Sequence, residues 1–206
     1  MYARTITVHA RPENVDAGMS YVRDDAVPAV MKLPGCVGVS LLASHSDGMC
    51  ISASAWESEA AMRGSADAGM PMRERAGELF DAAPRAEEWE MAAMHRERTP
   101  GSGACARVTW IQADPGDIDH DIDVFRTITL PAVGEFGGFC SGSLLVDRAS
   151  GRAVATFAYA DADALAETRR MADDLRIRTM SQMRAAVQDV HEFDLVVAHL
   201  HVPELA

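Results

Sequence analysis

The sequence lacks the basic clusters and long apolar runs that mark nucleic-acid-binding and membrane proteins. Its 19 Lys and Arg residues are outnumbered by 31 Asp and Glu residues, giving a net charge of -12. Phosphate binding depends on clustered Lys and Arg, so nucleic acid is not expected as a partner. No apolar run approaches the roughly 18 residues needed to span a bilayer, so no membrane association is expected either.

Signs of export and of a cysteine-based site are also missing. The first nine residues contain no apolar signal-peptide core. Four cysteines lie far apart, without a Cys-x-x-Cys pair: Cys36, Cys50, Cys105 and Cys140. We therefore expect no zinc or redox site, and reduced, mostly buried cysteines in a cytoplasmic protein.

The motifs of several large enzyme classes are absent. There is no Gly-x-Ser-x-Gly elbow, phosphate loop or dinucleotide fingerprint, which argues against covalent hydrolase and nucleotide-dependent chemistry. His199 and His201 share a face of the last predicted strand, but no third ligand is visible nearby. Two histidines seldom make a stable metal site, so no metal is expected.

The strongest positive signal is a strand-to-helix passage that occurs twice. Alternation in residues 51–56 places three side chains on one face of a predicted strand: Ser52, Ser54 and Trp56. Ser58 follows where a helix N-cap belongs. The passage recurs at residues 154–165, with Tyr159 in the place of Trp56 and Asp161 in the place of Ser58.

The chain matches itself at an offset of 103 residues. Matched positions include Arg4 with Arg107, Pro12 with Pro115, Gly35 with Gly138, and Gly48 with Gly151. Residues 97–103 are polar, rich in turn formers and join the two copies. We predict two homologous domains, at residues 1–98 and 104–206.

Each copy is predicted to have the element order βαββαβ. In the first copy we expect a strand over 4–9, a helix after Pro12 that bends or ends near Pro28, and a hairpin of two strands that turns at 46–48. A helix over 58–82, interrupted at 69–71, and a strand over 87–94 complete the copy. The second copy repeats the order, with an unbroken helix over 161–187 and a last strand over 192–200. The fold class is α+β: two ferredoxin-like domains, each with both helices on one face of an antiparallel sheet.

Three features recur in both copies: a Gly before the second strand, a strand end that opens a capped helix, and an aromatic residue in the last strand. The residues of the first copy are Pro34-Gly35, Leu41-Leu42, Trp56-Glu57-Ser58-Glu59 and Trp89. They resemble the antibiotic biosynthesis monooxygenase-like domains of the dimeric α/β-barrel superfamily. That family commonly forms homodimers, so the resemblance implies that the two domains pack sheet to sheet as an intrachain pseudo-dimeric α/β barrel. A further homodimer is left open.

The resemblance implies two chemistries, cofactor-free oxidation of anthrones by dioxygen and oxidative haem degradation. In the anthrone oxygenases an Asn precedes the tryptophan by four residues and a Tyr follows it by six. Here Trp56 is kept, while those positions hold Ser52 and Met62, or Ala155 and Leu165 in the second copy. The Asn, second Trp and His of the haem degraders have no counterpart in either copy, so haem degradation is not expected.

From the first copy we take Trp56, Ser52 and His9 as candidate catalytic residues. Trp56 could stack on a flat substrate and donate its indole N–H to an enolate-like oxygen, Ser52 offers a hydroxyl, and His9 is a candidate base. The alternatives are a packing role for Trp56 and a structural or exposed role for His9. Candidate substrate-binding residues are Thr7, Ser54, Met62, Trp110 and Tyr159. Arg75 and Arg178 could hold an anionic group, although exposed helix arginines usually meet water or a surface carboxylate.

Two hypotheses of function follow. The first is a cofactor-independent monooxygenase-like enzyme that uses dioxygen on a small hydrophobic molecule, such as a polycyclic aromatic, in a pocket between sheet and helices of the first copy. The second is a non-catalytic tandem protein that binds a hydrophobic ligand or a partner. The loss of the family's Asn, Tyr and His favours the second.

Overall fold

The computed structural model describes residues 1–200 and 203–205, and the chain divides into two compact units. Unit 1 consists of Met1–Trp89 with Asp194–Val202, and unit 2 of Glu90–Phe193 with Pro203–Ala206. Two strands, β4 (Arg85–Arg96) and β8 (Ala186–Leu200), begin in one unit and end in the other. The polar segment at 97–103 therefore lies inside unit 2.

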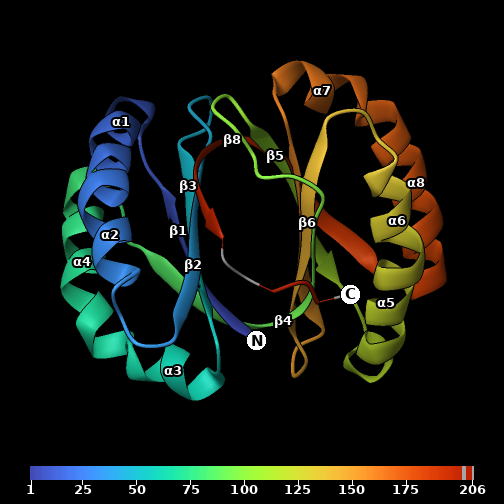
Figure 1. The fold of residues 1–206 in the computed structure, drawn as a ribbon, viewed down its shortest axis with the longest axis horizontal. Helices are drawn as coiled ribbons and strands as arrows, with labels where there is room; N and C mark the ends of the chain where they lie inside the picture. Colours follow the sequence, from blue (N-terminus) through green and yellow to red (C-terminus); the bar gives the residue numbers. More distant parts are fainter. Residues whose placement is uncertain (201–202, 206) are drawn as a thin grey trace. The chain divides into compact units, whose positions relative to one another are not determined.

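Unit 1 is one antiparallel sheet with helices on one face (Figure 1). Its strands are β1 (Tyr2–His9), β2 (Cys36–Ala43) and β3 (Met49–Trp56), with β3 in the middle, and the end of β8 pairs with β2. Its helices are α1 (Pro12–Tyr21), the π-helical turn Val22–Ala26, α2 (Val27–Val30), α3 (Glu59–Gly64) and α4 (Ala66–Phe80).

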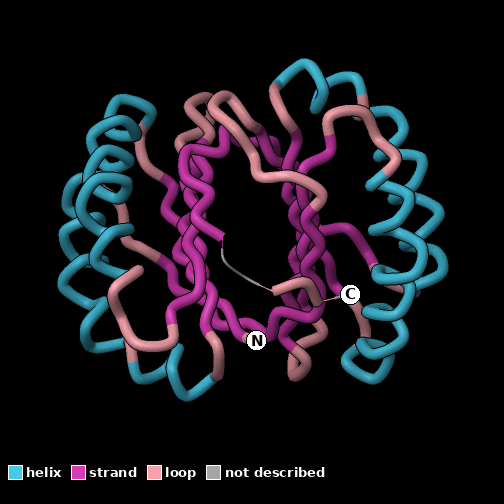
Figure 2. The backbone as a smooth tube through the Cα atoms, in the orientation of Figure 1, coloured by secondary structure: helices cyan, strands magenta, loops and turns pink. Residues whose placement is uncertain are grey.

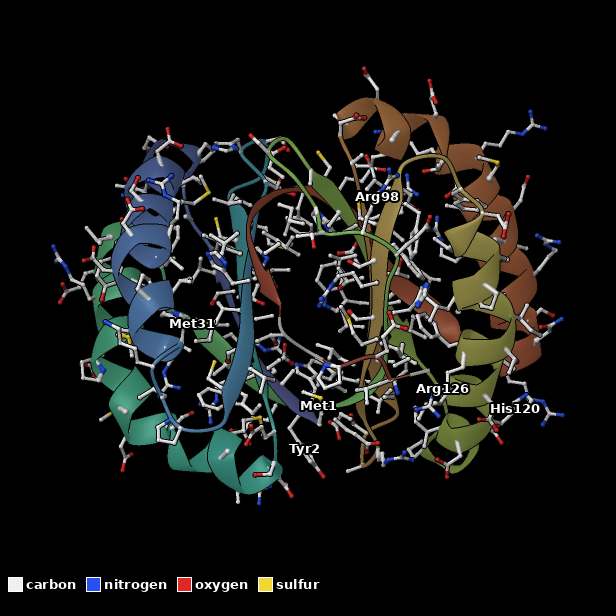
Figure 3. The ribbon with its side chains drawn as sticks, in the orientation of Figure 1. Met1, Tyr2, Met31, Arg98, His120 and Arg126 are labelled. Carbon is white, nitrogen blue, oxygen red and sulfur yellow. The ribbon has the colours of Figure 1, made fainter. Side chains whose placement is uncertain are left out.

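Unit 2 repeats this plan, with a layer of helix and a layer of strand (Figure 2). Strand β7 (Arg152–Tyr159) lies between β5 (Cys105–Gln112) and β6 (Phe139–Asp147), and the end of β4 pairs with β6. The helical segments are the 3-10 turn Pro115–Asp117, α5 (Ile118–Val124), the π-helical turn Phe125–Thr129, α6 (Leu130–Gly134), α7 (Ala162–Glu167) and α8 (Arg169–Met183). His120 and Arg126 lie on the helical side of this unit (Figure 3).

The hydrogen-bonded order of the strands is β1-β3-β2-β8-β5-β7-β6-β4, closing from β4 to β1. Every pairing described within the units is antiparallel. The mixed α+β class and the predicted element order of each copy are confirmed. The last strands are longer than expected, because residues that read as helix end or turn in the sequence join the sheet.

Local signals in the sequence explain where several elements begin and turn. The Ser58 side chain accepts a hydrogen bond from the Ala61 N–H at 3.1 Å, and Asp161 caps α7 in the same way at 2.8 Å. These two predicted N-caps are confirmed. At the hairpin turn, Gly48 has a φ of +75° and its Cα hydrogens face the Ala10 carbonyl, so only glycine fits.

The predicted interruption of the second helix at residues 69–71 is wrong. Pro71 lies inside α4, and the break comes at Ser65 instead. The second copy, where no break was expected, is interrupted at Thr168. In both copies the hydroxyl donates to the carbonyl three residues back, and a buried arginine from the first strand of the copy binds the same carbonyl. This long-range contact ends the first helix segment.

Each unit has its own hydrophobic core between sheet and helices. In unit 1 the core includes Val15, Leu41 and Phe80, and in unit 2 it includes Phe125, Phe139 and Tyr159. All four cysteines are free, and all except Cys36 are buried, as expected. Among the described residues, no helix is long and apolar enough to cross a membrane.

Candidate functional site

The candidate site is a cavity in unit 1, between the sheet and the helical layer. It encloses about 800 Å³ of space free of protein atoms, including space open to solvent. The strands supply one wall, through β1, β2 and β3, and the opposite wall comes from the π-helical turn, α2 and α4. Most of the lining is aliphatic, so the cavity favours an apolar molecule.

Strand alternation brings the three residues of the repeated passage to this cavity. Ser52, Ser54 and Trp56 all line it, as their predicted common face requires. Their direct neighbours across the sheet on β1 are Ile6, Arg4 and Tyr2 respectively. The placement of these three side chains on one face is confirmed, while their roles remain a prediction.

The polar atoms of these residues are used unequally. The Trp56 Nε1–H donates to the Ser54 hydroxyl at 3.0 Å, and that hydroxyl donates to the Arg4 carbonyl at 3.3 Å. Trp56 is only 1% exposed. In the described part of the chain, the Ser52 hydroxyl has no hydrogen-bond partner. Ser52 is therefore the hydroxyl that is free to bind a ligand, and the Trp56 N–H can do so only by leaving Ser54.

A buried arginine closes one end of the cavity. Arg4 is 5% exposed and donates to the Ser65 hydroxyl, the Met62 carbonyl and Glu88, each at 2.8 Å. Its charge is thus paired and its N–H groups are satisfied, as a buried cation requires. Met62 contributes its backbone to this network and is not among the cavity-lining residues, contrary to a substrate contact through its side chain.

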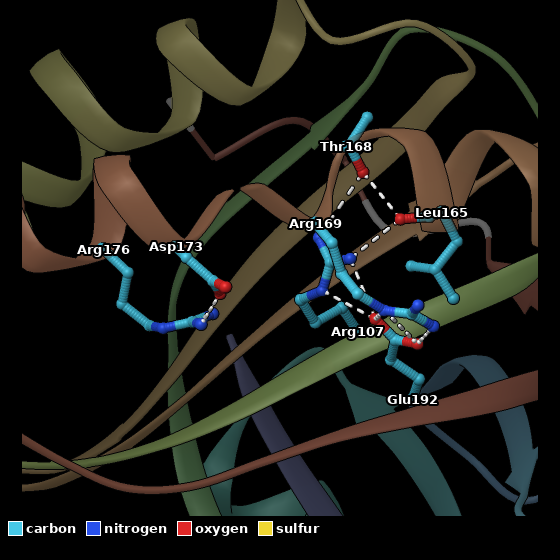
Figure 4. A network of polar contacts seen from close by, with 7 residues as sticks. All are labelled: Arg107, Leu165, Thr168, Arg169, Asp173, Arg176 and Glu192. Atoms are coloured by element: carbon cyan, nitrogen blue, oxygen red, sulfur yellow. Dashed lines mark hydrogen bonds and ion pairs between the residues drawn. The ribbon is translucent and has the colours of Figure 1, made fainter. Parts of the chain in front are cut away.

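Unit 2 has the same arginine network (Figure 4). Arg107 donates to the Leu165 carbonyl at 2.8 Å and to Glu192 at 2.9 Å, and Arg169 also binds Glu192. Burial alone would raise the pKa of Glu192, but the hydrogen bonds from Arg169 and Arg107 outweigh it, and the pKa lies below its usual value. Because the network occurs in both copies, it reads as part of the scaffold and not as a catalytic device.

One reactive group on the cavity wall is chemically quiet. Cys50 is 2% exposed and lines the cavity. Burial raises the pKa of its thiol to about 12, with a further contribution from Asp47. The thiolate is the nucleophilic form, so Cys50 is not a nucleophile near neutral pH.

The corresponding space in unit 2 is smaller, about 480 Å³. Two rings fill it: Phe125 and Phe157 are stacked with centroids 5.8 Å apart and planes at 19°. Their counterparts in unit 1, at the 103-residue offset, are Val22 and Ser54. The larger cavity of unit 1 follows from these small side chains. The site prediction for the first copy accordingly falls on the more open of the two.

The remaining predicted residues lie elsewhere. Arg4, Ile6 and Val8 of β1 line the cavity, so Thr7 and His9 are on the opposite face of that strand, with His9 exposed. The structure does not bring a His9 base to this cavity.

In unit 2, Tyr159 lines the smaller cavity with the Arg107 guanidinium 5.7 Å from its ring centroid. Trp110 faces away from that cavity and packs edge-on against His191 and Phe193. Neither residue lies with the Ser52 group. His201, considered with His199 as a metal pair, lies outside the described residues.

The sequence analysis missed one charged residue of the site. Arg73 lines the unit 1 cavity, whereas Arg75, which we had considered for an anionic group, is exposed and paired with Glu78 at 2.8 Å. Arg73 stands four residues after Gly69 and three before Ala76, both also on the cavity wall. This helical spacing could have revealed it.

The comparisons with known proteins identify relatives along the whole chain. No protein-family model matches. The uncharacterized protein Rv2558 of Mycobacterium tuberculosis (strain H37Rv) is 44% identical over 206 residues, covering 100% of this chain and 87% of that protein.

Solved structures share the fold at much lower identity. An anthrone oxidase-like protein matches with a TM-score of 0.66 at 13% identity, covering 96% of this chain and 92% of that chain. A Listeria monocytogenes protein of ferredoxin fold, related to antibiotic biosynthesis monooxygenases, matches with a TM-score of 0.56 at 11% identity, covering 96% and 95%. The resemblance found in the sequence is therefore confirmed at the level of the fold.

Proposed function

The chain belongs to the same family as Mycobacterium tuberculosis Rv2558, and we propose that it is a monooxygenase-like enzyme that oxidises a small hydrophobic molecule with dioxygen, without a bound cofactor. The observation that carries the proposal is the cavity of unit 1. It is largely aliphatic, and it presents a free Ser52 hydroxyl and the Trp56 ring on one wall. The anthrone oxidase-like fold supports the choice of reaction class.

The reaction requires a substrate that forms a stabilised carbanion. The substrate C–H loses its proton to water, and the carbanion gives an electron to dioxygen. The two radicals then join in a C–O bond, and loss of water from the protonated peroxide leaves a carbonyl. One oxygen atom enters the substrate and the other leaves as water.

The protein's part is to hold the substrate and stabilise its enolate-like oxygen. Ser52 is the donor for that oxygen in this proposal, because its hydroxyl is free in the described structure. The aliphatic walls exclude water and strengthen this hydrogen bond. Water acts as the base, since His9 lies on the other face of β1.

The test is dioxygen uptake with a tricyclic anthrone, comparing the protein with Ser52→Ala and Trp56→Phe. Loss of a transition-state donor should lower kcat by about a hundredfold in Ser52→Ala. Ser40→Ala is the matched control, because Ser40 lies between the cavity-lining Val39 and Leu41 and so faces away. Uptake that is equal in Ser52→Ala and Ser40→Ala would refute the assignment of Ser52.

The second candidate function is a non-catalytic binding protein. Two observations favour it: no Asp, Glu or His is among the cavity-lining residues of the described chain, and the Trp56 N–H is already bound to Ser54. Binding of the anthrone without uptake above the uncatalysed rate would support this candidate and reject the oxygenase.

A further inference from the structure

The unit 1 cavity contains one arginine whose charge is not matched. Two arginines are the permanent charges on its wall, Arg4 and Arg73. Arg4 is fully paired within its buried network. Arg73, half-buried, makes a single hydrogen bond within the described chain, from Nη2 to the Ala66 carbonyl at 3.2 Å, and has no carboxylate partner there.

Unit 2 shows what the same arginine does when a carboxylate is at hand. Arg176, the counterpart of Arg73 at the 103-residue offset, lines the smaller cavity and is ion-paired with Asp173. The counterpart of Asp173 in unit 1 is Met70, which is 48% exposed and carries no charge. The two copies therefore have the same guanidinium on the cavity wall, and only one of them supplies its anion.

Unit 2 also fills its cavity with aromatic side chains. The stacked rings of Phe125 and Phe157 line this cavity. At the matching positions unit 1 has Val22 and Ser54, and its cavity is larger. Unit 2 thus supplies from its own chain both an aromatic body and a carboxylate, and unit 1 leaves the places of both open.

We infer that the unit 1 cavity binds an aromatic carboxylate, with the acid on Arg73 and the ring system in the space beside Val22 and Ser54. A guanidinium is suited to this role because its planar N–H groups match a carboxylate and stay charged. The absence of acidic side chains from the cavity wall keeps an anion from being repelled. The inference rests on the proposed function in using the same cavity, but it requires no oxygen chemistry.

The test is calorimetric titration under argon with 2-naphthoate and with its neutral analogue 2-naphthamide. The wild-type protein should bind the carboxylate at least about tenfold more tightly, as expected for a hydrogen bond to a charged group. Arg73→Gln should abolish that preference and leave the amide affinity unchanged. Arg176→Gln is the matched control in unit 2 and should keep the preference.

Two further variants transfer residues of unit 2 into unit 1. Met70→Asp, at an exposed helix position, places a carboxylate where Asp173 stands and should lower naphthoate affinity about tenfold. Ser54→Phe should weaken both probes by occupying the ring site. Because Met70→Asp changes only the surface of α4, it tests the inference even if Arg73→Gln fails to fold.

Each outcome decides one of the two proposals. Equal affinity for naphthoate and naphthamide, unchanged preference in Arg73→Gln or Met70→Asp, or no binding of either probe would overturn the inference. Binding with the expected preference but no dioxygen uptake by an anthrone would reject the proposed oxidation alone. Uptake without a preference for the acid would reject the inference alone.

Discussion

The buried carboxyl of Asp121 should make the protein less stable as the pH rises. Asp121 lies on α5, is 6% exposed, and neither of its oxygens has a hydrogen-bond partner among the described residues. Burial raises its pKa to about 6, with an opposing effect of His120 and a small further increase from Asp117. The unit 1 counterpart is Gly18, which has the Phe80 ring directly over it, so the carboxyl is not a requirement of the fold.

The sign and size of the effect follow from linkage. The folded state holds the Asp121 proton up to a higher pH than the unfolded state, whose reference pKa is 3.8. Stability is therefore highest at low pH and falls as the pH rises through the interval between the two values. A shift of about two units corresponds to about 2–3 kcal/mol of unfolding free energy between pH 4 and pH 7.5.

The variant that isolates this effect is Asp121→Asn. The amide has nearly the same shape and the same lack of partners, but it cannot ionise. Urea unfolding, followed by circular dichroism from pH 4 to 7.5, should show the variant gaining about 2–3 kcal/mol over wild type across that range. Asp123→Asn is the control, since Asp123 lies on the same helix and is exposed. A difference between Asp121→Asn and wild type that does not change with pH would refute the reasoning.

Three other predictions concern the scaffold. Gly48→Ala should lower the unfolding free energy by more than about 1 kcal/mol, because the residue has a positive φ and faces the Ala10 carbonyl, whereas Gly64→Ala, in open space on α3, should raise it by about 0.5 kcal/mol; thermal melting of both variants checks this. Glu192→Gln should cost about 3 kcal/mol at neutral pH by removing the charge that pairs buried Arg107, and since the pKa of Glu192 is lowered, the difference should persist at mildly acidic pH and vanish only below the usual carboxyl range; a difference that is already gone at pH 5 would contradict the network. Cys50 should react with iodoacetamide at pH 8 only after urea is added, and mass spectrometry that finds it labelled in the folded protein would contradict its burial.

Much of the local structure could be predicted because its causes are local. The N-caps of α3 and α7 depend on one side chain and the backbone three residues on. The common face of Ser52, Ser54 and Trp56 follows from the two-residue period of a strand. The helix break was misplaced at Pro71, because the break at Ser65 depends on Arg4, 61 residues away in the sequence.

The candidate site was predictable only in part. Alternation groups residues by face but does not say which face meets the helices, so His9 and Thr7 could not be separated in advance from Ser52. Arg73 and Arg75 are both helix arginines, and only the packing of α4 shows that Arg73 reaches the cavity. The difference in cavity size came from Phe157 and Phe125, whose rings meet across a strand and a helix.

The sequence by itself determined the duplication, the α+β order of elements in each copy and the polar face that carries Ser52. These depend on repeats, periods and caps that act over a few residues. The tertiary structure decided that β4 and β8 each begin in one unit and end in the other, that Asp121 is buried without a partner, and that Arg73 is unmatched while Arg176 is paired. Such properties depend on which distant side chains come together, and a one-dimensional pattern does not contain those distances.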